Sequence, residues 1–253
     1  MVLAPPEIKA LLFDLDGTLL DIDFRSFLDE YATTVAQRFA DVAPVDVFKR
    51  QLFLSTRAMI FNDKPGRTTL QAFLDDFTAA LPLPDDAVSR FVDYYLTEFP
   101  RLRKWSRPSP GGRELVEAAL RRGLLVVLAT APFFPEIAVR ERLRWAGLGD
   151  TPFHFITSSD KMTRSKPFPE FFLEVASHIG VAPEHCLMVG DETVMDGAAV
   201  KAGMQVALIG PEKPSYSDPW LDKALLEESA RLNLPRYPDL PALHRELAAR
   251  GVL

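Results

Sequence analysis

The chain has 253 residues, of which 47% are hydrophobic and 25% are charged, and its formal net charge is −6. This composition is typical of a globular protein with one large domain or a domain with a smaller insert. The acidic balance argues against binding to nucleic acid, and no run approaches the ~20 apolar residues of a membrane span. We therefore expect neither a nucleic-acid partner nor a membrane partner.

Five short apolar runs, each bounded by polar residues or glycine, predict buried strands. They cover residues 8–13, 124–129, 153–157, 186–189 and 205–209. Amphipathic segments that end at a glycine precede the later runs and predict helices. Strands that are apolar throughout and alternate with helices predict a doubly wound α/β fold, in which helices cover both faces of a Rossmann-like parallel sheet.

The pattern changes between the first two predicted strands. Apolar and aromatic residues recur there at helical spacing in three stretches, 24–39, 70–81 and 88–99. We expect an all-helical cap domain, residues 21–104, inserted into a catalytic core made of residues 1–20 and 105–253. The apolar stripes could line a ligand cavity, but packing of one helix on another is the expected role.

The C-terminal segment and the one cysteine give little information about function. The segment from residue 211 ends in a predicted helix, 241–250, and its pattern indicates no chemical role. The single cysteine, Cys186, excludes an intrachain disulfide and lies in an apolar run, where a packed thiol is expected. Such cysteine usage favours a reducing compartment, so we predict a cytoplasmic location.

Polar groups follow the predicted strands, and in an open parallel sheet ligands bind at the carboxyl ends of the strands. In chain order these groups are Asp14 and Asp16, then Thr130 and Ala131, then Lys166, then Asp191 and Asp196. Any one of them alone is usually a turn, a helix cap or a solvated side chain. Together they place carboxylates, a hydroxyl and a lysine at one edge. A carboxylate cluster needs a cation, and hard oxygen ligands suit Mg²⁺, so this set predicts phosphoryl transfer.

The segment Asp14-Leu15-Asp16-Gly17-Thr18-Leu19, followed by Thr130, Lys166-Pro167 and Gly190-Asp191 with Asp196, resembles the haloacid dehalogenase superfamily. Within it, the helical insert is similar to that of capped phosphatases such as phosphoglycolate phosphatase. The resemblance implies a Mg²⁺-dependent phosphatase that acts on a small phosphorylated metabolite. It implies that Asp14 is the nucleophile, which forms an aspartyl-phosphate, and that Asp16 is the general acid and base.

The same resemblance implies the remaining roles. Mg²⁺ would be held by Asp14, the backbone carbonyl of Asp16, and Asp191, with Asp196 as a direct or indirect ligand. Thr130, the backbone N–H of Ala131 and Lys166 would bind the phosphoryl group. Glu192 is either a residue that supports a metal ligand or a solvated residue at the start of a helix.

Several alternatives stay open. Sugar-phosphate mutases share all of these residues, and a catalytically silent phosphate-binding or regulatory module would have lost a carboxylate, which this chain has not. The dehalogenases fit less well because they lack the counterpart of Asp16. Ala131 stands where phosphoglycolate phosphatases usually have asparagine, which argues against phosphoglycolate itself. Polar candidates for substrate selection in the insert are Asp21, Arg25, Arg57, Asn62, Lys64 and Arg67.

Overall fold

A six-stranded parallel sheet forms the centre of the computed structural model, which describes residues 7–212 and 221–253. The strand order is β5-β4-β1-β6-β7-β8, and every neighbouring pair is parallel. The strands are β1 (Ala10–Phe13), β4 (Leu125–Leu128), β5 (Phe155–Ile156), β6 (Cys186–Gly190), β7 (Gln205–Ile209) and β8 (Arg236–Tyr237). The predicted Rossmann-like sheet is confirmed. Strand β8 comes from the C-terminal segment, for which the sequence predicted no strand.

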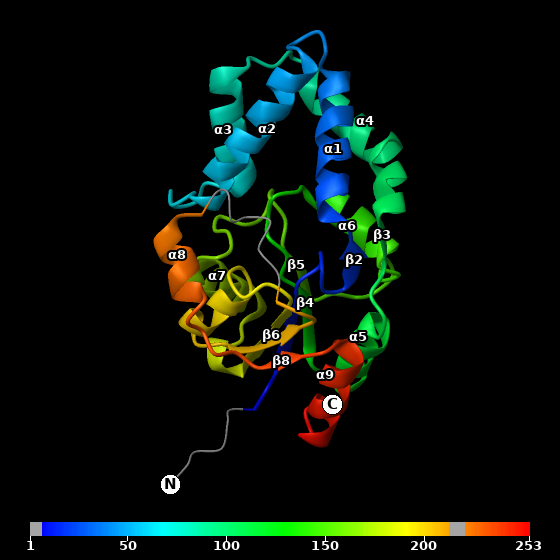
Figure 1. Ribbon diagram of the computed structural model, residues 1–253, viewed down its shortest axis with the longest axis vertical. Coiled ribbons are helices and arrows are strands. Elements are labelled where there is room, and N and C mark those ends of the chain that lie inside the picture. Colours follow the sequence, from blue (N-terminus) through cyan, green and yellow to red (C-terminus); the bar gives the residue numbers. More distant parts are fainter. Residues whose placement is uncertain (1–6, 213–220) are drawn as a thin grey trace.

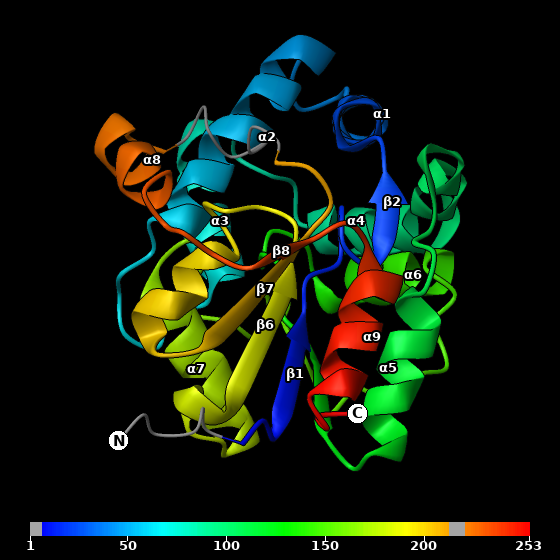
Figure 2. The same ribbon diagram turned by 60° about the horizontal axis from the view of Figure 1, so that its bottom comes forward.

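Helices cover both faces of this sheet. They are α5 (Gly112–Arg121), α6 (Glu136–Trp145), α7 (Pro169–Ile179) and α9 (Leu240–Ala249), with the short 3₁₀ helix η3 (Gly197–Ala202). Helix α8 (Lys223–Ser229) packs instead in a third cluster with Ile60 and Met195, and the 3₁₀ helix η2 (Pro183–His185) leads into β6. Leu11 and Phe13 of β1 pack in one cluster with α5, α6 and α9, whereas Ala10 and Leu12 pack in another with α7 and η3. Figure 2 shows α5 and α9 on one side of the sheet and α7 on the other. Because both faces are covered, the strands can be apolar throughout.

In the chain, four helices are inserted between β1 and the next strand of the sheet, β4. They are α1 (Phe24–Arg38), α2 (Val45–Ile60), α3 (Thr69–Ala80) and α4 (Ala87–Thr97), followed by the 3₁₀ helix η1 (Phe99–Trp105). The chain enters and leaves them through two short antiparallel strands, β2 (Leu20–Ile22) and β3 (Ser106–Pro108). Helix α2 was not among the three predicted stretches. The exact division into a core and a cap domain stays a prediction.

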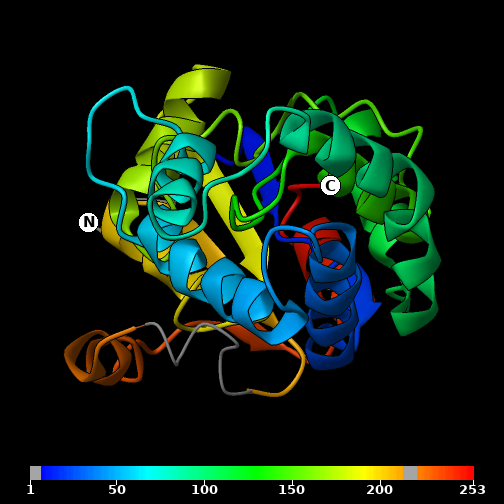
Figure 3. The same cartoon turned by 90° about the horizontal axis from the view of Figure 1, so that it is seen from above.

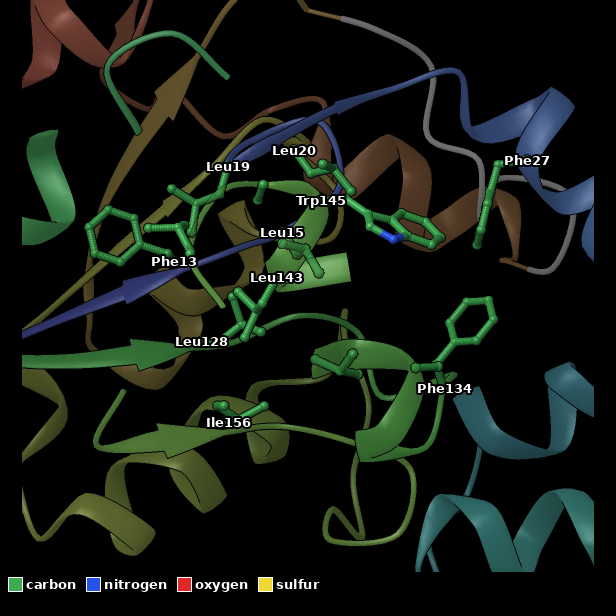
Figure 4. Packing of buried hydrophobic residues seen from close by; sticks show 14 of the residues in the cluster. Phe13, Leu15, Leu19, Leu20, Phe27, Leu128, Phe134, Leu143, Trp145 and Ile156 are labelled. Atoms are coloured by element: carbon green, nitrogen blue, oxygen red, sulfur yellow. The ribbon is translucent and has the colours of Figure 1, made fainter. Parts of the chain in front are cut away.

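The four inserted helices lie beyond the carboxyl ends of the sheet strands (Figure 1). Contacts between aromatic rings join them to the core. The ring of Trp145 on α6 stacks on Phe99 of η1, with centroids 5.2 Å apart, and meets Phe27 of α1 edge-on. Phe134, which follows β4, also packs against Phe27 (Figure 4). The inserted helices therefore share one hydrophobic core with α6 and lie against the edge where the predicted site residues lie.

Two further observations concern the sequence predictions. Cys186 is fully buried in the second cluster, and burial raises the pKa of its thiol to about 11, as expected for a packed rather than a reactive cysteine. Among the helices of the part of the chain that the structure describes, none is long and apolar enough to cross a membrane.

Candidate active site

All seven predicted site residues line one small pocket at the carboxyl ends of β1, β4 and β6. The pocket has a volume of about 60 Å³. Its lining comprises Asp14, Asp16, Thr130, Ala131, Lys166, Asp191 and Asp196, with Phe24, Phe133, Glu192 and Met195. We call it the catalytic pocket. Segments separated by more than a hundred residues thus converge because their strands are neighbours in the sheet.

Lys166 is the positive centre of the catalytic pocket. Its side chain is buried, and its ammonium group donates to Oδ1 of Asp14 at 2.8 Å and to Oδ1 of Asp196 at 2.5 Å. Burial alone would lower the pKa of Lys166, but the two carboxylates outweigh it and raise that pKa. The lysine therefore stays charged and holds two carboxylates of the pocket in place.

Three carboxylates gather around this lysine. Asp14, Asp191 and Asp196 each present an oxygen within 4.8 Å of the others, and all three are buried. Burial raises the pKa of Asp14 well above its ordinary value; Lys166 opposes this shift, and the negative charges of Asp196 and Asp191 add to it. Hard oxygen donors at this spacing fit a small divalent cation such as Mg²⁺.

Asp196 also fixes the turn that carries Asp191. Its Oδ2 accepts hydrogen bonds from the backbone N–H groups of Asp191, at 3.0 Å, and Glu192, at 3.1 Å, while its other oxygen faces Lys166. Both oxygens of Asp196 are thus engaged by the protein, whereas Asp14 accepts only from Lys166 among the side-chain hydrogen bonds described. The side chain of Asp196 therefore holds both the ammonium group of Lys166 and the backbone of the Asp191 turn in place.

Two glycines let these groups approach closely. Gly17 has a φ of 85°, and a Cβ there would lie 2.3 Å from Oδ2 of Asp191. A Cβ at Gly190 would lie 2.1 Å from the Cγ of Asp196. Neither distance is possible for real atoms, so side chains at these positions would displace the carboxylates. Gly17 is therefore required by the closeness of the β1 and β6 loops, and Gly190 by the fold of the β6 loop back onto itself.

Asp16 points to a different partner. Its Oδ2 accepts a hydrogen bond from the guanidinium of Arg142 on α6, which is 1% exposed and lies over the ring of Phe134 at 4.4 Å. Burial raises the pKa of Asp16, and the positive charge of Arg142 opposes that shift. The sequence gives no signal for Arg142, because this residue lies among several charged residues of an amphipathic helix, where an exposed position is the usual one.

Arg236 is a second residue that sequence reasoning missed. It lies on β8, and its guanidinium donates to the backbone carbonyl of Asp191 at 3.1 Å and to the hydroxyl of Thr193 at 2.8 Å. It also reaches the carbonyls of Ile209 and Gly210 at 3.3 Å. The C-terminal segment, for which the sequence predicted no role, thus braces the loop that carries Asp191.

The polar candidates predicted for substrate selection lie elsewhere. All six are described, and none of them lines the catalytic pocket. Asp21 pairs with Arg107, Arg67 pairs with Asp75, and the Asn62 amide donates to two backbone carbonyls. From the inserted helices, the aromatic side chain of Phe24 borders the pocket instead.

Comparisons with known proteins agree with the resemblance. The family model described as haloacid dehalogenase-like hydrolase matches residues 8–203. N-acetylmuramic acid 6-phosphate phosphatase from Pseudomonas aeruginosa is 31% identical over 212 residues, which cover 81% of this chain and 85% of that protein. Protein SUPPRESSOR OF QUENCHING 1, chloroplastic, from Arabidopsis thaliana is 29% identical over 209 residues, 79% of this chain but only 17% of that protein.

A solved structure shares the fold. The crystal structure of a HAD phosphatase from Thermococcus onnurineus superposes with a TM-score of 0.56 at 21% identity, covering 95% of this chain and 98% of that one. At this identity the likeness concerns the fold alone. With the family match, it confirms the resemblance predicted from the motifs.

The close contact between Gly17 and Asp191 predicts that a side chain at position 17 lowers activity. Gly17→Ala should move the Asp191 carboxylate and reduce hydrolysis of p-nitrophenyl phosphate by about a hundredfold, the usual effect of displacing a reacting group by about 1 Å. Gly123→Ala is the matched control, because its φ of 79° is similar but a Cβ there meets nothing within 4 Å. Both should lose about 1–2 kcal/mol of stability from backbone strain in urea unfolding. Equal activity in the two variants would contradict the assigned contact.

Proposed function

Because the chain belongs to the haloacid dehalogenase-like hydrolase family, we propose that it is a Mg²⁺-dependent phosphatase acting on a small phosphorylated metabolite through an aspartyl-phosphate intermediate. The observation that carries this proposal is the buried cluster of Asp14, Asp191 and Asp196 around Lys166, in a pocket of about 60 Å³. So small a pocket suits a phosphoryl group rather than a whole metabolite. The relative from P. aeruginosa, by its name, acts on a phosphorylated sugar.

We assign the metal to the carboxylates of Asp14 and Asp191 and to the backbone carbonyl of Asp16. Asp196 supports them indirectly, since its oxygens already accept from Lys166 and from two backbone N–H groups. When bound, Mg²⁺ would neutralise negative charge on the phosphoryl oxygens and keep Asp14 ionised. The donor set fits this ion because it consists of oxygens alone.

Asp14 is the proposed nucleophile. One of its carboxylate oxygens forms a bond to phosphorus while the bond between phosphorus and the leaving oxygen breaks in line. Lys166, the hydroxyl of Thr130 and the backbone N–H of Ala131 would hold the phosphoryl oxygens. The backbone of Thr130 is fixed by the Thr157 hydroxyl, which donates to its carbonyl at 2.7 Å. A water molecule then attacks phosphorus, releases phosphate and regenerates Asp14.

Asp16 would transfer the protons of both steps. It gives a proton to the leaving oxygen in the first step and takes one from the attacking water in the second. Burial favours its protonated form, as the first step requires, whereas its ion pair with Arg142 favours the ionised form. We propose that Asp16 turns from Arg142 toward the leaving oxygen when substrate binds, so that Arg142 holds the carboxylate between turnovers.

The location of the protein and the acceptor of the phosphoryl group are two further points of the proposed function. A cytoplasmic location is consistent with a buried free thiol at Cys186. The sugar-phosphate mutase alternative differs in the acceptor of the phosphoryl group, which would be a second hydroxyl of the sugar instead of water.

The nucleophile is tested by Asp14→Asn, which keeps the shape of the side chain. Turnover measured by phosphate release should fall below about a hundredth of the unchanged protein, a small part of the ~10⁶-fold acceleration usual for enzymes. Asp63→Asn, an exposed aspartate on the same chain, is the matched control and should leave turnover unchanged. Full phosphate release by Asp14→Asn would rule out this nucleophile. In the unchanged protein, transfer of the phosphoryl group from one sugar hydroxyl to another without phosphate release would favour the mutase.

The metal is tested by thermal unfolding at two pH values. In metal-free protein the pKa of Asp14 is raised above its value in the unfolded chain. The stability linked to this group is therefore fully present below the unfolded pKa and is lost as the pH rises through the folded pKa. Mg²⁺ should raise Tm at about pH 8, where a hundredfold excess over Kd adds about 2.7 kcal/mol to the free energy of unfolding. It should have little effect at about pH 4, where the raised pKa of Asp14 keeps a proton on that ligand.

Asp191→Asn provides the control for this measurement, because it removes one proposed ligand and leaves Asp14 in place. It should weaken the effect of Mg²⁺ at the higher pH. A Tm that does not respond to Mg²⁺ at about pH 8 would contradict the metal assignment.

A further inference from the structure

A second cavity, about 250 Å³ in volume, lies inside the ring of inserted helices. All four helices contribute to its wall, through side chains such as Leu28 of α1, Phe53 of α2, Phe73 of α3 and Phe91 of α4. Residues that follow β4 also line it, namely Phe133, Phe134, Pro135 and Ile137. Figure 3, seen from above, shows α1 to α4 arranged around this part of the molecule. We call it the cap cavity.

The cap cavity and the catalytic pocket are adjacent, because Phe133 belongs to the lining of both. The catalytic pocket, at about 60 Å³, has little room beyond the phosphoryl group. The leaving group of a substrate must therefore extend out of it. Past Phe133 it would enter the cap cavity, which is larger than the roughly 150 Å³ apolar cavity that can hold benzene.

The walls of the cap cavity are almost entirely apolar. None of the described residues that line it carries a charged side chain. The hydroxyls of Tyr31 and Tyr95 are hydrogen-bonded to each other at 2.9 Å, and the Thr56 hydroxyl donates to the carbonyl of Leu52 at 2.8 Å. Only the buried hydroxyl of Ser159 lacks a partner among the described lining residues. A polyol or sugar placed here would lose most of its hydrogen bonds with water and regain few.

The apolar faces of the helices are thus divided between two roles. Phe48 stacks on Phe39 and meets Phe77 edge-on, and these rings fill the interior between helices. Phe73 and Phe91 line the cap cavity, although each also packs on an interior ring, Phe73 on Phe77 and Phe91 on Phe39. A largely apolar pocket of this size is the kind of site at which small molecules bind, so its place beside the catalytic pocket indicates an occupant.

We propose that the cap cavity binds the leaving group of the substrate, and that this leaving group is an apolar alkyl or arylalkyl alcohol. The inference rests on the phosphatase function proposed above and adds the class of substrate to it. It separates this chain from the P. aeruginosa relative, which is named for a sugar phosphate.

The test compares n-alkyl phosphates of increasing length with glycerol phosphate and with acetyl phosphate, whose leaving group is too small to fill the cap cavity. We expect kcat/KM to rise by about fourfold for each methylene that becomes buried, or about sixtyfold from propyl to hexyl phosphate. Glycerol phosphate should be a poorer substrate than propyl phosphate. Equal kcat/KM along the alkyl series, with acetyl phosphate hydrolysed, would overturn the inference and leave the phosphatase function intact. Failure to hydrolyse even acetyl phosphate would overturn the phosphatase function.

A variant that fills the cap cavity gives an independent readout. Leu74 of α3 lines the cap cavity, and Leu74→Trp should remove most of the preference for hexyl over propyl phosphate. Leu96→Trp is the matched control, because Leu96 is 63% exposed on α4 and is not part of the lining. It should keep the full preference.

Direct binding covers the case in which Leu74→Trp does not fold. In the unchanged protein, 1-hexanol should inhibit hydrolysis of hexyl phosphate competitively. Binding of 1-hexanol without such competition would show that the cap cavity has an occupant other than the leaving group, and would overturn the proposal.

Discussion

The buried ammonium group of Lys166, shared by the carboxylates of Asp14 and Asp196, is the interaction on which the site depends. Unit charges about 4 Å apart interact by roughly 4 kcal/mol at the effective dielectric of a protein, so three close carboxylates repel one another strongly. One lysine balances only one of them. The remaining two negative charges equal the charge of one divalent cation, and this balance is the physical reason for assigning a metal to the cluster.

The sheet brings these charges together at little conformational cost. Asp14 extends β1 and Asp191 follows β6, and these two strands are hydrogen-bonded neighbours. The loops after these strands can approach only because Gly17 has no side chain, and Gly190 lets the second loop bring Asp196 back toward Asp191. From the outside, Arg236 of the last strand holds the backbone of the Asp191 loop. A segment near the C-terminus thereby supports an active site whose first residue, Asp14, lies near the start of the chain.

Much of this arrangement was predictable from the sequence, for physical reasons that also explain the gaps. Continuous apolar runs predicted five strands correctly, because burial on both faces leaves no room for polar residues. The two-residue strand β8 and its Arg236 gave no such signal. Arg142 was missed because helical periodicity shows on which face of a helix a residue lies but not which other element packs on that face. The same limit left the role of the aromatic stripes open: Phe39 and Phe48 fill a helix interface, whereas Phe73 and Phe91 line a cavity.

The central claim is that Asp14 receives the phosphoryl group beside a metal held by its neighbours. A crystal structure of the protein with Mg²⁺ and beryllium fluoride, which mimics a phosphoryl group on a carboxylate, tests it most directly. The account predicts beryllium bonded to an oxygen of Asp14, Mg²⁺ bound by Asp14 and Asp191, and the ammonium of Lys166 against a fluorine. Beryllium fluoride bonded to another residue, or Mg²⁺ bound away from these carboxylates, would contradict it.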